Sequence, residues 1–359
     1  MQRIVITLIA IMTMITTNAQ TLTERQKGLA ACACLMAQGD TNRLEPAVRM
    51  ALDKGVTINE LKEAFSQLYA YTGFPRSLNA LGVLSKVWEN KQPNWQEGKP
   101  WKRPAEWDNA KKAYELGTKN QAQLSGKPFN YDFCPQDDYY LKSHLFGNIF
   151  AGDQLSAADR EIVTVAALSG LEGVAPQLAA HKQGAVNMGN SKQLVDELCT
   201  WLCNEGYTLN TMWPKGEPNP YGKYFIGQSY LADVGGDVMN VTFEPGCRNN
   251  WHIHHKQVQV LICVAGKGWY QEWGKEPQEL TPGTVIAVPA EVKHWHGAKK
   301  DSWFQHLTYH RDVLEGASNE LMEQREQSDA GIDFAESRQK SSVTQWCEPV
   351  DDATYNALK

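Results

Sequence analysis

The sequence has 359 residues, a formal net charge of -6 at pH 7, 42% hydrophobic residues and 21% charged residues. This length exceeds one ordinary hydrophobic core and the composition is that of a globular protein, so at least two domains are expected. The acidic balance lacks the basic surface typical of nucleic-acid-binding proteins, and we expect no nucleic-acid partner.

Residues 1–19 have the features of a secretory signal peptide. Arg3 supplies a positive charge, residues 4–14 are almost wholly apolar, and Ala19 ends the stretch with a small residue. The apolar run is too short to span a bilayer, and no later stretch is long and apolar enough to do so. The sequence therefore predicts export to the periplasm or outside the cell, without a membrane span.

The eight cysteines permit disulfides in an exported chain, but they are too sparse to define a small cross-linked scaffold. Cys32 with Cys34, and Cys199 with Cys203, lie in apolar helical patterns. Such settings favour buried free thiols, and the sequence predicts no particular pairing.

Helices are predicted from Thr21 onward. The stretch from Thr21 to Glu24 resembles a capping box, and an alanine-rich helix follows it. A second helix is expected over residues 44–54, where Gly55 ends it, and a third begins near Glu60 with an apolar stripe.

A similar plan recurs from Leu155, with helices expected over residues 155–168, 178–187 and 194–202. The segment ending at Gly55 matches the one ending at Gly189, which predicts an internal duplication. The expected boundaries are a first repeat at 22–90, a polar connector at 91–127 with one helix around 105–117, and a second repeat at 128–207.

Three segments carry a family resemblance: YAYTGFPRSLNAL at residues 69–81, Arg160 with Glu161, and the Leu-x-x-His that ends at His181. They resemble the carboxymuconolactone decarboxylase family, here in tandem over about residues 22–207. The resemblance implies an all-α fold and assembly into a homo-oligomer. Some relatives use a Cys-x-x-Cys pair for thiol peroxidase chemistry, and this chain has no such pair.

His181 and Glu161 are the candidate acid/base residues of the second repeat, because a histidine and a carboxylate on neighbouring helices can exchange a proton near neutral pH. The first repeat has Gln26 and Ala47 at about the corresponding places, so we expect it to be catalytically empty. A surface or interface histidine is the alternative for His181. Two roles are possible for Arg76: it binds a substrate carboxylate, or it anchors helix ends.

Strands are predicted in the C-terminal half. A proline- and glycine-rich linker at 208–225 precedes a barrel at 226–314, and residues 315–359 form an arm that completes it. Within that arm, charged residues 315–340 predict a solvated helix or an extended cover. Short β-branched or aromatic runs separated by turns favour a double-sheet barrel, with strands at 238–243, 258–264, 269–273, 285–288 and 304–309.

Seven of the nine histidines lie between His252 and His310. His252 with His254, and His294 with His296, are spaced by two residues. On a strand each pair points to one face, so both pairs can line one cavity. This pattern predicts a metal centre.

The glycine, histidine and proline spacing from Gly246 to His294 resembles the cupin family. The resemblance implies four metal ligands: His252, His254, Gln259 and His294. Three imidazoles and an oxygen suit divalent manganese, iron or zinc, and the sequence does not choose among them.

Two residues depart from the cupin pattern. Gln259 stands where many cupins have glutamate, and its neutrality leaves the metal more positive, which strengthens Lewis acidity and weakens cation affinity. Glu291 replaces the usual glycine after Pro289, and a positive φ there would be strained.

His296 and His306 are expected to face the same cavity without being needed as ligands, so they are candidate general bases or substrate partners. Residues 239–356 resemble cupins related to bacterial hydroxynitrile lyases. That resemblance implies that His296 and His306 move a proton between a cyanohydrin hydroxyl and cyanide. His255 and His310 are expected to face solvent, while a tryptophan set packs the outer side of the barrel or a partner subunit. This set comprises Trp251, Trp269 and Trp295.

Together these patterns predict a multi-domain chain: an all-α duplicated carboxymuconolactone decarboxylase-like domain followed by an all-β cupin, a double-stranded β-helix or jelly-roll barrel. The expected activity is that of an exported, metal-dependent lyase. It acts on a small oxygenated organic molecule by Lewis-acid-assisted proton transfer with carbon–carbon bond cleavage. The alternatives are a thiol-dependent antioxidant related to peroxiredoxins, and a non-catalytic small-molecule-binding cupin on an oligomerising helical domain.

Overall fold

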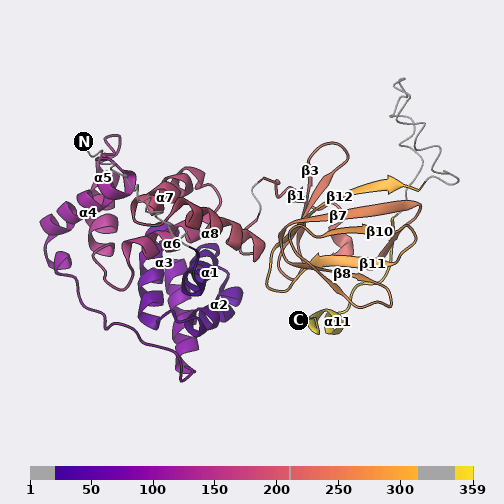
Figure 1. Ribbon diagram of the computed structural model, residues 1–359, viewed down its shortest axis with the longest axis horizontal. Coiled ribbons are helices and arrows are strands. Elements are labelled where there is room, and N and C mark those ends of the chain that lie inside the picture. The colour runs from indigo at the N-terminus through magenta and orange to yellow at the C-terminus, as the bar shows by residue number, and fades with distance from the viewer. Residues whose placement is uncertain (1–20, 210–211, 314–343, 359) are drawn as a thin grey trace, which may run out of the picture.

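The computed structural model describes residues 21–209, 212–313 and 344–358. A helical half is followed by a half made of two antiparallel sheets (Figure 1), which confirms the predicted fold class. The predicted signal peptide and the charged arm at 315–340 lie outside the described residues. Within the described ranges, no helix combines the length and apolarity needed to cross a bilayer.

The helical half contains, in chain order, α1 (Glu24–Gln38), α2 (Thr41–Asp53), α3 (Ile58–Glu89), the 3-10 turn η1 (Ala105–Asp108), α4 (Ala110–Ser125), α5 (Pro135–Tyr140), the π-helix η2 (Leu141–Ile149), α6 (Ala157–Ser169), α7 (Ala175–Asn187) and α8 (Lys192–Asn204). Helix α1 is buried along most of its length and packs against α2, α3 and α6. The duplication of this domain stays a prediction.

Local capping sets the helix starts. The capping box expected at Thr21 and Glu24 forms two residues later, where the Thr23 hydroxyl accepts from the Gln26 backbone N–H and the Gln26 side chain accepts from the Thr23 backbone N–H. The Thr23 pairing places a glutamine at the third helical position, where its side chain can reach back to the cap. The connector helix expected at 105–117 is instead a short turn followed by α4.

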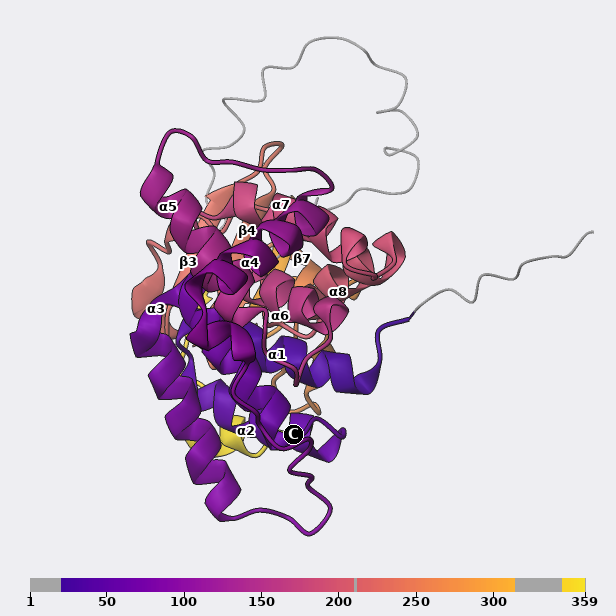
Figure 2. The same ribbon diagram turned by 90° about the vertical axis from the view of Figure 1, so that its left-hand side faces the viewer.

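Helix α3 runs along one side of the helical half (Figure 2) and changes direction at Gly73. Gly73 has φ 79° and ψ 158°, a conformation that glycine adopts without a Cβ clash. Beyond the kink, the Arg76 guanidinium donates to the Ala37 carbonyl at the end of α1. Of the two readings of Arg76, the structure shows the anchoring of a helix end.

The second half is built from two antiparallel sheets. One sheet has the order β1 (Glu217–Pro218), β3 (Ser229–Asp233), β4 (Met239–Phe243), β12 (Phe304–Asp312), β7 (Gln257–Gly266) and β10 (Val285–Val288). The other has the order β13 (Thr344–Trp346), β6 (His252–His254), β11 (His294–Ala298), β5 (Arg248–Asn249) and β2 (Phe225–Ile226), with β8 (Gly268–Glu272) on β11 and β9 (Gln278–Leu280) on β8.

The C-terminal helix α11 (Asp352–Asn356) covers one face of the second sheet. Trp251, Trp295 and Tyr355 form a hydrophobic cluster there, with Trp269 packed against it. The cluster agrees with the predicted outer packing of these tryptophans, and it keeps them away from the histidines that alternate with them along the strands.

The two halves are in contact near the end of α8. The Gly206 carbonyl accepts both from Arg43 Nη1 at 3.0 Å and from the Trp303 backbone N–H at 3.1 Å. Lys267 Nζ lies 2.6 Å from Glu205 Oε2. These bonds join the residues after α8 to the loop before β12 and to the turn between β7 and β8.

Candidate metal centre

Strand pairing brings three of the predicted ligands together. His294 on β11 lies opposite His252 on β6, and His254 shares the face of His252. One ring nitrogen of each of these three buried histidines lies within 4.8 Å of the others. The alternation of side chains along two neighbouring strands is sufficient to explain this convergence.

Hydrogen bonds to Nδ1 fix which ring nitrogen faces the centre. His252 Nδ1 lies 2.9 Å from the Asn250 carbonyl oxygen, and His294 Nδ1 lies 2.9 Å from the Val292 carbonyl oxygen. A carbonyl only accepts, so Nδ1 carries the proton and Nε2 keeps a lone pair. Such outer partners orient metal-binding histidines.

Burial favours the neutral imidazole that a metal needs. It lowers the pKa of His254 to about 3 and that of His294 to about 4, and it holds the pKa of His252 well below its ordinary value. All three rings therefore present lone pairs at neutral pH.

Gln259 supplies the fourth donor, from β7 in the other sheet. Its Oε1 lies 3.1 Å from His254 Nε2 and 3.0 Å from His294 Nε2. For His294 this brings two acceptors face to face, an arrangement that a cation between them would stabilise. Three imidazoles and one amide oxygen fit a divalent transition metal, so the group can hold one.

Asn249 determines the tautomer of His296. The Asn249 Oδ1 accepts from the His296 backbone N–H at 2.9 Å, so its Nδ2 must be the atom 3.0 Å from His296 Nε2. Nδ2 only donates, which leaves the proton of His296 on Nδ1. That buried Nδ1–H has no hydrogen-bond partner among the described residues. Sequence reasoning missed Asn249, because no ligand spacing marks it.

His306 leaves a ring nitrogen open as an acceptor, whereas His296 leaves one open as a donor. Its Nδ1 lies 3.3 Å from the Leu307 carbonyl oxygen, and its buried Nε2 has no partner in the described part of the chain. The two rings pack edge to face with centroids 4.8 Å apart. Burial lowers the pKa of His306 to about 4, so this ring keeps an open acceptor while His296 keeps an open donor.

Of the other two cupin histidines, which were expected to face solvent, His310 is exposed and His255 is half-buried. His255 bonds to Glu291 at 2.7 Å, and His310 packs its ring against His254 with centroids 4.7 Å apart. Glu291 does have the positive φ that was expected to be strained, at 65°. Its carboxylate accepts from the Lys256 backbone N–H at 2.9 Å, which offsets part of that strain.

The candidate pair of the helical half also meets. His181 Nδ1 on α7 lies 2.8 Å from Glu161 Oε2 on α6, and Tyr71 packs its ring edge against His181. Glu161 is fully buried and His181 nearly so. At the corresponding places of the first repeat, Gln26 caps α1 and Ala47 lies in the core, so neither offers acid/base chemistry.

All eight cysteines are free thiols. Burial raises the pKa of Cys34 to about 12 and that of Cys203 to about 11, so neither is a thiolate at neutral pH. A thiolate is the reactive form of cysteine, and these environments therefore disfavour thiol chemistry.

Two family models match the sequence. The Carboxymuconolactone decarboxylase family matches residues 7–86, and the Cupin domain matches residues 239–304. The chain thus joins a helical half, whose first part matches the first family, to a two-sheet half that matches the Cupin domain. The first match begins inside the predicted signal peptide, and export stays a prediction.

The chain is 42% identical over 84 residues to an (R)-mandelonitrile lyase from Granulicella tundricola, and the match covers 23% of this chain and 63% of that protein. The chain therefore spans less than two thirds of this relative. The two domain matches and the similarity to this relative fit a small-molecule enzyme or a small-molecule-binding cupin.

Two solved structures also resemble the chain. A cupin-like protein from Thermotoga maritima is 25% identical, with a TM-score of 0.32, and the match covers 42% of this chain and 98% of that one. A DMSP lyase from Ruegeria pomeroyi is 19% identical, with a TM-score of 0.22, and the match covers 35% of this chain and 65% of that one. Both scores are low, so the cupin assignment depends on the family match and the sheets.

Proposed function

We propose that the chain is an exported, metal-dependent carbon–carbon lyase that acts on a small oxygenated molecule of the cyanohydrin type. The observation that carries this proposal is the convergence of ring nitrogens from His252, His254 and His294, two of which also lie within 3.1 Å of the Gln259 amide oxygen. The mandelonitrile lyase relative supports the reaction class. A carboxy-lyase would use the same centre.

The residues divide into holders of the metal and handlers of the proton. Three histidines and Gln259 would hold a divalent manganese, iron or zinc ion, which when bound supplies a Lewis acid for a substrate oxygen. His296 and His306 are not needed for that ligand set. Each has one open ring nitrogen, which makes them available to the substrate.

The open atoms assign a role to each histidine. His306 Nε2 takes the hydroxyl proton, the bond between carbinol carbon and nitrile carbon breaks with its electron pair leaving on cyanide, and the carbon–oxygen bond becomes a carbonyl. His296 Nδ1–H donates a hydrogen bond to the developing negative charge. The protonated His306 is a strong acid, because burial lowers its pKa, and it returns the proton to cyanide. The products are an aldehyde and hydrogen cyanide.

The test is metal analysis of the purified protein combined with benzaldehyde release from mandelonitrile. We expect a stoichiometric transition metal, and we expect His252→Ala to lose the metal and at least about 100-fold in activity. His255→Ala is the matched control, since this neighbouring histidine is half-buried and bonds to Glu291 and Gln345, outside the centre. Metal-free wild-type protein, or full activity in His252→Ala, would contradict the proposal.

For the helical half, we propose assembly of the chain into a homo-oligomer, with His181 and Glu161 as a second acid/base pair. The short contact between them supports this role. The Glu161 Oε1 atom of this pair is buried without a hydrogen-bond partner among the described residues. His181→Gln should lower any turnover that survives in His252→Ala. If His252→Ala has no residual turnover, the acid/base assignment of this pair is removed.

A further inference from the structure

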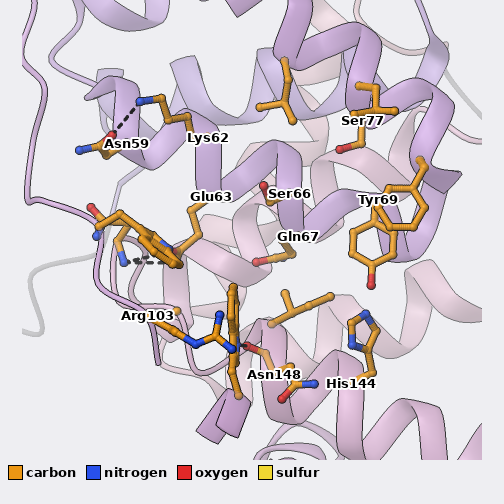
Figure 3. A pocket seen from close by; sticks show the side chains of 18 residues that line it. Asn59, Lys62, Glu63, Ser66, Gln67, Tyr69, Ser77, Arg103, His144 and Asn148 are labelled. Atoms are coloured by element: carbon orange, nitrogen blue, oxygen red, sulfur yellow. Dashed lines mark hydrogen bonds between the residues drawn. The ribbon is translucent and has the colours of Figure 1, made fainter. Parts of the chain in front are cut away.

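A cavity lies in the helical half, between α3, η2 and the connector that leads into η1. Its volume is about 590 Å³, which lies in the range of small-molecule pockets. Figure 3 shows Tyr69 and His144 at one side of this cleft, and Lys62, Glu63 and Arg103 toward the other. The metal centre contributes none of its lining residues.

Aromatic rings form much of the wall. Tyr69 and Phe74, on either side of the kink in α3, stack with centroids 4.2 Å apart and planes 9° from parallel. Trp101 and Trp107 of the connector segment lie with centroids 5.7 Å apart. Phe74 is 60% exposed and Trp101 is 55% exposed, so ring surface is left open to a ligand.

The floor is polar but carries no uncompensated negative charge. Glu63 accepts from the backbone N–H groups of Gln154 and Leu155 and forms an ion pair with the buried Arg160 guanidinium. Arg160 also donates to Gln67 Oε1 at 2.8 Å. The one carboxylate that lines the cleft is therefore neutralised and fixed in place.

The rim is positive. Lys62 donates to Asn59 Oδ1 at 3.2 Å and has no carboxylate partner among the described residues. The connector adds Arg103. Of the two cations that line the cleft, Arg103 pairs with Asp108, which leaves Lys62 as the unpaired charge. These cations favour an anionic group on the ligand.

We propose that this cleft binds a small aromatic carboxylic acid. The ring packs beside Tyr69 and Phe74 and against the connector tryptophans, and the carboxylate points toward Lys62 and Arg103. The cleft is a concave small-molecule site with an aromatic side and a cationic side, and this combination matches one flat ring bearing one anion. The site is independent of the metal centre and of the lyase proposal.

The experiment is titration of 4-fluorobenzoate into the full chain, followed by the fluorine NMR signal, with 4-fluorobenzyl alcohol as the neutral counterpart. We expect saturable binding of the acid, weakened roughly 2- to 10-fold by Phe74→Ala or by Trp101→Ala. Lys62→Gln should weaken the acid and leave the alcohol unchanged. Phe133→Ala is the matched control, since this ring is 91% exposed and lies outside the cleft.

Four outcomes would overturn the proposal. They are no saturable binding of the acid, equal affinity for the acid and the alcohol, acid binding that Phe74→Ala and Trp101→Ala leave unchanged, and acid binding that is lost only in His252→Ala. The last would place the acid at the cupin metal. If Phe74→Ala changes the oligomeric state and the acid does not bind, the rings form an interface between copies.

Discussion

The two buried histidine sites differ in what their ring nitrogens contact. In the helical half, His181 Nδ1 bonds to the fully buried Glu161 carboxylate at 2.8 Å. In the cupin, His296 Nδ1 and His306 Nε2 are buried and have no partner in the described chain. An unmet buried polar atom costs stability, so two of them beside a metal-binding group indicate atoms kept for a ligand. The helical pair also leaves Glu161 Oε1 buried without a partner in the described chain, so the comparison distinguishes a histidine bonded to a carboxylate from two histidines that each keep an open ring nitrogen.

The largest effect should come from an open site. His306→Gln removes the ring that accepts the hydroxyl proton, and we expect a fall of about 100- to 10,000-fold in mandelonitrile cleavage with the metal content unchanged. Arg311→Gln, on the exposed part of the same strand, is the control. Equal activity in both variants would break the comparison.

The His181–Glu161 pair should respond in stability. Glu161→Ala leaves His181 without its buried partner, and we expect the helical half to lose about 3 kcal/mol of unfolding free energy. The measurement is the urea midpoint of the helical circular dichroism signal. Glu115→Ala, on the exposed surface of α4, should leave that midpoint unchanged, and a matching result for Glu161→Ala would count against a structural pair.

The open site should also destabilise the metal-free cupin in acid. The folded-state pKa of His306 is about 4, below the ordinary value near 6.5, because burial disfavours the imidazolium. The neutral ring therefore contributes fully above pH 6.5, and that contribution is lost as the pH falls toward 4. We expect a decrease of up to about 3 kcal/mol, which denaturant unfolding at stepped pH would measure. His306→Gln should flatten the slope, and an unchanged slope would argue against burial as the cause.

A smaller effect is expected at the residue that orients the open donor. Asn249→Ser removes both bonds to His296 and should cost about 10- to 100-fold in activity, while the metal stays bound. Asn250→Ser is the control, because Asn250 contacts His252 through its backbone carbonyl alone. Loss of metal in Asn249→Ser would instead place Asn249 among the supports of the ligand set.

The sequence predicts the repeating features well and the tertiary partnerships poorly. Alternation along strands paired His252 with His254 and His294 with His296, because strand geometry fixes which residues share a face. The resemblance to cupins supplied the ligand set. Asn249 was not predicted, since its role depends on a hydrogen bond from β5 to His296 on the neighbouring strand β11. The aromatic cleft escaped for the same reason: Phe74 and Trp101 belong to distant segments whose meeting depends on the path of the connector.

Strand β13 places one support of the metal centre late in the chain. Thr344 Oγ1 lies 3.2 Å from His254 Nδ1, and the Trp346 ring packs against His252 with centroids 4.9 Å apart. A ribosome reaches Thr344 a few seconds after the last ligand, at about 5–20 residues per second. All four ligands are therefore synthesised before β13, the strand that contacts two of them. A metal ion that binds in that interval meets ligands whose orientation is not yet fixed by β13.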